Sequence, residues 1–120
     1  MHGIRSTRSR TRSTLRRADA ITWIDRHRAI VARTTGRGTI DVQEFSLPDD
    51  EAGRMLGLAA VAHAIGDRDR ILVLGPEPSR TSLEREYVSI FRRPDRLVDM
   101  EPEGPVSRAD LVALLREQAD

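Results

Sequence analysis

The chain has 120 residues, no cysteine and a formal net charge of +1. This length is typical of one domain, and the missing cysteines exclude disulfides, thiolate catalysis and cysteine-ligated metal sites. The longest apolar stretches, such as residues 56–65, are far shorter than the ~20 residues of a membrane span, so the sequence predicts a cytoplasmic protein with no membrane partner.

Residues 1–17 carry the basic character of the chain. They hold six arginines and no acid, which leaves fourteen arginines against nineteen acids, a net charge of −5, in residues 18–120. With Ile4 and Leu15 as its apolar anchors, the segment cannot offset the entropy of being ordered. We predict a disordered tail over residues 1–19, with a targeting segment or untranslated upstream sequence as alternatives, and one domain over residues 20–120. The arginines expected to contact RNA phosphates are Arg5, Arg8, Arg10, Arg12, Arg16 and Arg17.

Two short segments rich in β-branched residues come next, ITWID at residues 21–25 and AIVART at residues 29–34. The polar residues 26–28 separate them. This pattern predicts a β-hairpin whose turn is capped by the carboxylate of Asp25.

A third strand is expected in residues 39–47. Ile40 and Val42 share one face of it, whereas Phe45 and Leu47 share the other. This change of phase predicts a β-bulge within the strand.

A helix is predicted from a cap at Asp49 or Asp50 to about Ile65, with Gly66 ending it. After it, ILVLG at residues 71–75 is a continuous apolar run, which is typical of a strand buried on both faces. The helix has apolar residues at helical spacing, namely Met55, Leu58, Ala59, Ala62 and Ile65.

Thr81 and Glu84 have capping-box spacing, which predicts that a second helix opens at Thr81. Residues 96–100 are expected to form the last strand, and Ser107 opens a terminal helix with the same kind of cap. The resulting order is βββαβαβα. It predicts an α/β fold with a single mixed sheet, whose later strands are parallel and on which the helices pack.

The three histidines, His2, His27 and His63, have no spacing that suits a metal ion, so we predict no metal and no cofactor. His27 and Asp25 fall in the same predicted turn and form the one candidate acid–base pair. No nucleophile or oxyanion hole accompanies them. The sequence therefore predicts no catalytic residue, and a hydrolase that uses Asp25 and His27 is the alternative.

The segment GPEPSRT at residues 75–81 follows a buried strand and opens a helix. Free N–H groups and the helix dipole can bind an anion at such a position. The segment is not a P-loop, because GxxxxGK[ST] is missing and its two prolines remove N–H donors. A plain strand-to-helix turn is the alternative. The candidate contacts for an anion or a partner are Gly75, Ser79, Arg80 and Thr81.

Three segments carry a family resemblance: WIDRHRA at residues 23–29, ILVLGP at residues 71–76 before a helix with a basic residue, and RLVD at residues 96–99. Together they resemble small bacterial proteins related to the third domain of the archaeo-eukaryotic peptide-chain release factors and Pelota. The resemblance covers residues 21–118. It implies an α/β domain akin to the kink-turn RNA-binding ribosomal proteins, associated with translation or ribosome rescue.

The resemblance also implies the partner-binding domain of that family and not its catalytic one. Peptide release there depends on a Gly-Gly-Gln loop in a separate domain, whereas this chain has no Gly-Gly pair and its only glutamines are Gln43 and Gln118. Relatives usually have lysine after the Gly-Pro turn. Arg80 here keeps the charge but changes the hydrogen-bonding geometry.

The leading hypothesis is therefore a non-enzymatic module that binds the translation machinery, with the ribosome or RNA as its partner. The rival hypothesis is a small protein-interaction domain with no RNA role, whose acidic surface binds a protein partner. The oligomeric state is left open by the sequence.

Overall fold

The structure, a computed structural model, describes residues 19–100 and 106–119. The six arginines of the predicted tail lie outside these residues. The described strands are β1 (Ala20–Ile24), β2 (Arg28–Thr34), β3 (Ile40–Ser46), β4 (Ile71–Leu74) and β5 (Leu97–Met100). The helices are α2 (Glu51–Ile65), α3 (Ser79–Phe91), the short 3-10 helix η1 (Pro94–Arg96) and α4 (Arg108–Ala119). The predicted order βββαβαβα is confirmed.

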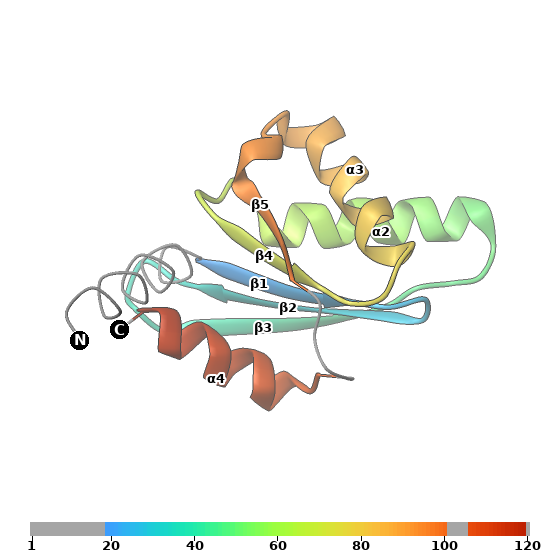
Figure 1. Cartoon of the computed structure of the whole chain (residues 1–120). Helices are drawn as coiled ribbons and strands as arrows, with labels where there is room; N and C mark the ends of the chain where they lie inside the picture. The colour runs from blue at the N-terminus through green and yellow to red at the C-terminus, as the bar shows by residue number, and fades with distance from the viewer. Residues whose placement is uncertain (1–18, 101–105, 120) are drawn as a thin grey trace, which may run out of the picture.

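The strands form one mixed sheet in the order β3-β2-β1-β4-β5 (Figure 1). β1 pairs antiparallel with β2, and β2 with β3, because short turns connect them. β4 and β5 run parallel, since α3 carries the chain back between them. β1 also pairs with β4, in parallel, so the first strand of the chain lies at the centre of the sheet.

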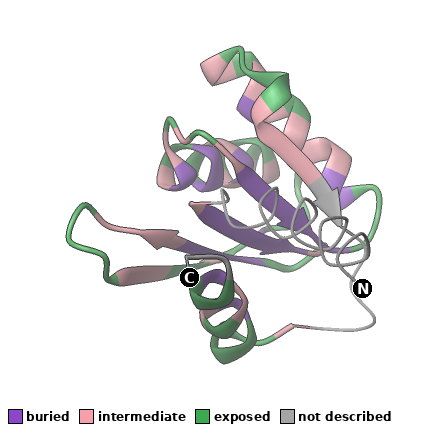
Figure 2. Cartoon of the chain, turned by 60° about the vertical axis from the view of Figure 1, so that its left-hand side comes forward, coloured by how far each residue is buried: buried purple, intermediate pink, exposed green. Residues whose placement is uncertain are grey.

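Helices cover both faces of this sheet, with α2 and α3 on one side and α4 on the other (Figure 1). Every residue of β1 and β4 is therefore buried, and these strands form the purple centre of Figure 2. Burial on both faces explains the continuous apolar run of β4. On the α4 side, Leu111 and Leu115 pack against Ile21, Trp23 and Leu72.

The predicted bulge in the third strand is wrong, because β3 has no bulge. Its pairing with β2 is continuous over the whole strand. Ile40 and Val42 pack into the core under α4, whereas Phe45 and Leu47 pack into the core under α2 and α3. The apolar side changes along the strand because each face has its own core, so no extra residue is needed.

Local capping signals place two of the helices. Asp50 is the N-cap of α2, where its carboxylate accepts a hydrogen bond from the N–H of Gly53 at 2.7 Å. Gly66 ends this helix with a φ of 79°, in the region that favours glycine. At α4, the Ser107 hydroxyl accepts from the Asp110 N–H at 3.2 Å, and the Asp110 carboxylate accepts from the Ser107 N–H at 3.0 Å. These three predicted helix ends are confirmed.

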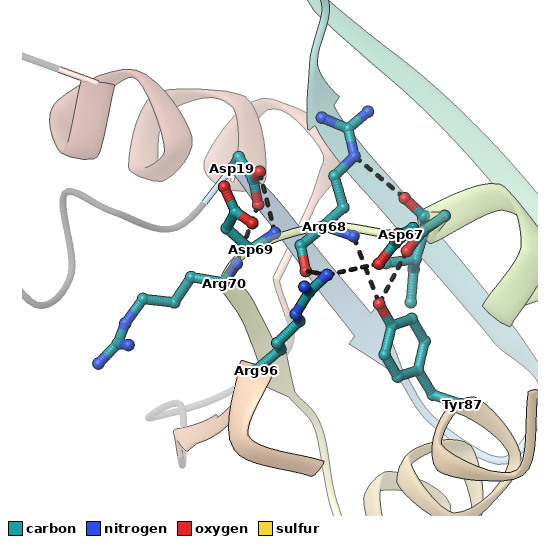
Figure 3. A network of polar contacts seen from close by, with 9 residues as sticks. Asp19, Asp67, Arg68, Asp69, Arg70, Tyr87 and Arg96 are labelled. Carbon is teal, nitrogen blue, oxygen red and sulfur yellow. Dashed lines mark hydrogen bonds and ion pairs between the residues drawn. The ribbon is translucent and has the colours of Figure 1, made fainter. Parts of the chain in front are cut away.

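A polar network at the amino ends of β1 and β4 holds the α2–β4 loop in place (Figure 3). The Asp19 carboxylate accepts hydrogen bonds from the backbone N–H groups of Asp69 and Arg70, each at 3.3 Å. The Arg68 guanidinium donates to the Thr34 carbonyl oxygen at 2.7 Å. The charged DRDR segment thus connects the start of β1 to the end of β2.

Tyr87 of α3 completes the network. Its hydroxyl donates to the Gly66 carbonyl oxygen at 2.8 Å, and its side chain is fully buried. Burial raises the pKa of this phenol, although a hydrogen bond from the Arg68 N–H acts in the opposite direction. Arg96 bonds the Asp67 carboxylate and the Arg68 carbonyl oxygen. The loop is therefore fixed to α3 and to the start of β5.

Candidate binding site

The β1–β2 turn and the β4–α3 loop meet at the carboxyl ends of two neighbouring parallel strands. Trp23 of β1 is opposite Leu74 of β4 in the register. Gly75 follows with a φ of 135°, and a Cβ atom there would lie 1.8 Å from the Ile24 carbonyl oxygen. Glycine is required because the two backbones touch. In open α/β sheets the region beyond the carboxyl ends of the strands is where ligands bind.

A hollow of about 380 Å³ lies between these two loops and the start of α2. Arg54 of α2 reaches across it and donates to the Arg26 carbonyl oxygen at 2.6 Å and to the Ser79 hydroxyl at 3.5 Å. The exposed guanidinium of Arg26 lies 3.8 Å from the Asp49 carboxylate. The lining residues are Arg26, Asp49, Arg54, Pro76, Glu77, Pro78 and Ser79. Both signs of charge line the hollow, so it suits a polar ligand.

The start of α3 differs from the prediction. The helix begins at Ser79 after an N-cap Pro78 that makes no side-chain cap, so the capping box at Thr81 and Glu84 is wrong. Glu77 performs the capping instead. Its carboxylate accepts from the Thr81 N–H at 2.9 Å and from the Thr81 hydroxyl at 2.6 Å.

Glu77 supplies a negative charge at the position where an external anion is expected. The hydrogen bonds from the Thr81 hydroxyl and N–H hold the pKa of Glu77 below its usual value, and the nearby Arg80 guanidinium, at 3.8 Å, acts in the same direction. Negative charge at a helix N-terminus is favourable because the dipole and the free N–H groups stabilise it. A phosphate at this helix start would have to compete with Glu77.

The four predicted contacts lie together in this loop, but they differ in exposure. Gly75, Ser79 and Arg80 are buried, and the Arg80 side chain is only 8% exposed. Thr81 is half-buried and lines a second groove, of about 540 Å³. That groove lies between α3 and the start of β5, and its walls include Val88 and Leu97. Contact of these four residues with an anion or a partner stays a prediction.

Asp25 has the contacts of a turn residue. One carboxylate oxygen accepts from the backbone N–H groups of His27 and Arg28 at 2.8 and 2.9 Å, and the other from the Trp23 indole at 3.1 Å. Partial burial raises the pKa of Asp25, but these hydrogen bonds outweigh it and hold the pKa below its usual value. A general base needs a raised rather than a lowered pKa at neutral pH. The contact between Asp25 and His27 is made by the His27 backbone and not by its ring.

Sequence patterns alone do not single out Arg26, Asp49 or Arg54, although all three line the hollow. Arg54 meets the Arg26 carbonyl across 28 positions of the chain, and no local pattern predicts such a contact. One signal was available. Arg54 is the single charged residue between Glu51 and His63 in an otherwise apolar or small-residue helix, which suggests a specific role.

Within residues 19–100 and 106–119, no group of three histidine, aspartate or glutamate side chains could hold a metal ion. Among the same residues, no helix has the length and apolar character needed to cross a bilayer.

The fold is that of a domain found in Pelota. The structure of Pelota from Archaeoglobus fulgidus is similar to this chain, with a TM-score of 0.58 and 13% sequence identity. The similarity covers 96% of this chain and 35% of the Pelota chain, so this chain spans about a third of the length of that protein. No protein-family model and no curated protein sequence matches the chain. The likeness to Pelota expected from the three sequence segments is therefore found in the fold.

Proposed function

We propose that this chain is a non-enzymatic binding module of the translation machinery, acting at the ribosome or on RNA as an accessory of translation or ribosome rescue. The observation that carries the proposal is the Pelota-like fold, which extends over 96% of the chain. The contacts of Asp25 support the non-enzymatic part, because its carboxylate is engaged by the turn. A cytoplasmic location follows from a function at the ribosome.

We divide binding between two parts of the chain. The tail carries +6 over residues 1–17 and residues 18–120 carry −5, so nonspecific RNA affinity should reside in the tail. Each phosphate contact releases counterions from the RNA. For single-stranded RNA, the logarithm of the binding constant therefore falls with the logarithm of the salt concentration, with a slope of roughly −0.7 per contact. Six arginines would therefore give a slope of at most about −4.

The domain would contribute the structured contact, at the hollow beside the β4–α3 loop. Gly75 and Ser79 belong to this loop and Thr81 lines the neighbouring groove. The buried guanidinium of Arg80 lies 3.8 Å from the Glu77 carboxylate of the same loop. Arg26 is the exposed cation of the hollow. A phosphate or carboxylate of the partner would pair with Arg26, since the Arg54 guanidinium is already used by the two loops.

The experiment titrates the full chain and a variant lacking residues 1–17 against single-stranded RNA and against ribosomes, each at two salt concentrations. We expect the shortened variant to lose RNA affinity and the salt slope, yet to bind ribosomes saturably and more weakly. If the variant lacking residues 1–17 does not bind ribosomes, the proposed ribosomal role of the domain is refuted. No binding by either form would favour the rival protein-interaction domain.

A matched pair of substitutions locates the domain's contact. Arg26→Ala changes the exposed arginine of the β1–β2 turn at the hollow, and Arg37→Ala changes an exposed arginine in the β2–β3 turn at the other end of the strands. In the variant without residues 1–17, Arg26→Ala should weaken ribosome binding several-fold and Arg37→Ala should not. Equal effects would mean that the domain binds by overall charge and not through the hollow.

One observation favours the rival hypothesis, a protein-interaction domain with no RNA role. Met55 and Leu56 of α2 are 55% and 74% exposed, and exposed apolar surface of this kind marks protein interfaces when it is contiguous. If neither form of the chain binds RNA or ribosomes, this helix face becomes the primary candidate for function.

A further inference from the structure

The outward face of α2 lacks the polar character of a solvent-exposed helix. Met55 and Leu56 are the large apolar side chains that are exposed among the described residues, and the exposed Ala52 and Ala60 lie beside Leu56 at helical spacing. A surface helix normally has charged or polar side chains on this face. Here Arg54 turns inward to the two loops, so no charged side chain interrupts the apolar face.

The two ends of this face carry opposite charge. At its start, Asp49, Asp50 and Glu51 are exposed, although Arg26 pairs with Asp49 at 3.8 Å. Asp50 also caps the helix. The face therefore begins with a net negative charge.

At the far end, the ring of His63 meets the ring of Phe91 with centroids 6.2 Å apart. Arg92 and Arg93 follow Phe91 directly, and both are exposed. The nearby Asp67 is bonded to Arg96, and the exposed Asp95 offsets one of the two arginines. The face thus ends with net positive charge, about 22 Å from its start for a helix of this length.

We propose that the partner covering this face is a second copy of the chain, with the two α2 helices packed antiparallel about a two-fold axis near Leu56. A two-fold interface brings the same surface of both copies together, so the surface must be complementary to itself. Antiparallel packing satisfies this condition, because the acidic start of each helix meets the basic end of the other. The two helix dipoles also oppose each other favourably.

The side chains of the face suit such a contact. The two Leu56 side chains meet at the axis, and on each side of it Ala52 of one copy lies opposite Ala60 of the other, which lets the helices approach closely. Met55 adds an adaptable apolar side chain at the border. One pair of helices buries less surface than a standard protein interface. The dimer should therefore be weak and form as concentration rises.

The test is sedimentation velocity of the full chain over a range of concentrations, after nuclease treatment and in moderate salt so that RNA does not bridge copies. We expect a reversible monomer–dimer equilibrium. Leu56→Asp should weaken it by at least about tenfold, as burying a charge at the centre of an interface does. Ala113→Asp, at an exposed position of α4, is the matched control and should leave it unchanged. Circular dichroism checks that both variants are folded.

A charge exchange separates self-association from binding to another protein. Glu51→Arg alone places arginine against Arg93 of the second copy, and Arg93→Glu alone places glutamate against Glu51, so each variant should dimerise several-fold more weakly than the wild type. An equimolar mixture of the two variants should regain the wild-type affinity, because both ends of the mixed dimer are then complementary. A chain that stays monomeric at every concentration, a dimer that survives Leu56→Asp, or variants that do not rescue each other would overturn the proposal.

Discussion

Replacing Gly75 with alanine is expected to destabilise the whole fold, although Gly75 lies in the loop predicted to contact an anion. The reason is the contact between the β4–α3 loop and β1. An alanine Cβ would lie 1.8 Å from the Ile24 carbonyl oxygen and 2.9 Å from its carbonyl carbon. These are backbone atoms of a central strand, so they cannot move aside as a flexible side chain would.

The magnitude follows from two separate costs. A non-glycine residue at a φ of 135° is strained by about 1–3 kcal/mol, and forcing an extra methyl group into packed structure costs typically about 1–3 kcal/mol more. The sum, about 2–6 kcal/mol, is a large part of the ~5–15 kcal/mol that stabilises a typical domain. With the urea dependence of a small protein, the unfolding midpoint should fall by about 1 M or more.

Urea unfolding followed by the fluorescence of Trp23 measures this effect, since Trp23 is the single tryptophan and is 5% exposed on β1. Gly36→Ala is the matched control, because nothing lies within 4 Å of a Cβ placed there and its φ is not positive. The control should change stability by no more than about 0.5 kcal/mol. If Gly75→Ala unfolds at the wild-type urea midpoint, the backbone contact described above does not exist in solution.

Three further substitutions test the hydrogen bonds of the fold. Tyr87→Phe should cost about 0.5–1.5 kcal/mol, because it removes the hydrogen bond to the partly buried Gly66 carbonyl oxygen. Burial raises the pKa of Tyr87, so wild-type stability should fall above about pH 10, where the unfolded chain loses this proton first. Urea titrations of the variant should lack that fall. Asp25→Asn should lower stability by about 1 kcal/mol at pH 7. The difference in stability between wild type and variant should shrink as the pH falls through the lowered pKa of Asp25. If a hydrolytic activity is found and Asp25→Asn or His27→Ala removes it, the non-enzymatic proposal is wrong. Ser107→Ala should cost about 0.5–2 kcal/mol, seen as reduced protection of the α4 amides in hydrogen exchange, and unchanged protection would show that the cap contributes nothing.

Local sequence signals were sufficient where a few neighbouring residues determine the structure. Asp25 accepts hydrogen bonds from residues two and three positions later, and the caps at Asp50 and Ser107 act within three positions. The apolar run of β4 correctly indicated a strand buried on both faces. Such contacts depend on chain neighbours, which the sequence states directly.

The two errors have different causes, one long-range and one local. The predicted bulge in β3 assumed one apolar core, whereas Val42 and Phe45 pack into cores on opposite faces of the sheet. The prediction that Thr81 caps the helix rested on a common motif. The Glu77 carboxylate, four residues before Thr81, accepts a hydrogen bond from the Thr81 N–H instead, and the helix already begins at Ser79. In both cases the pattern was real, and the surrounding structure gave it another role.

The sequence indicated the loop beside which the hollow lies, but not which side chains line the hollow. The Gly75–Thr81 segment does lie beside a hollow at the end of the sheet, next to the β1–β2 turn. The burial of Arg80 and the inward course of Arg54 depend on how α2 and α3 pack. Sequence alone cannot show which arginine of such a cluster is exposed.

The central place of β1 has a consequence for synthesis of the protein. β1 forms its antiparallel pair with the strand that directly follows it, but its other edge waits for β4, with Ala20 pairing to Ile71, 51 positions later. Pairs so distant in sequence close slowly. A nascent chain that ends before Ile71 would therefore present the apolar strand AITWI with one open edge, the kind of edge that joins strands of other chains.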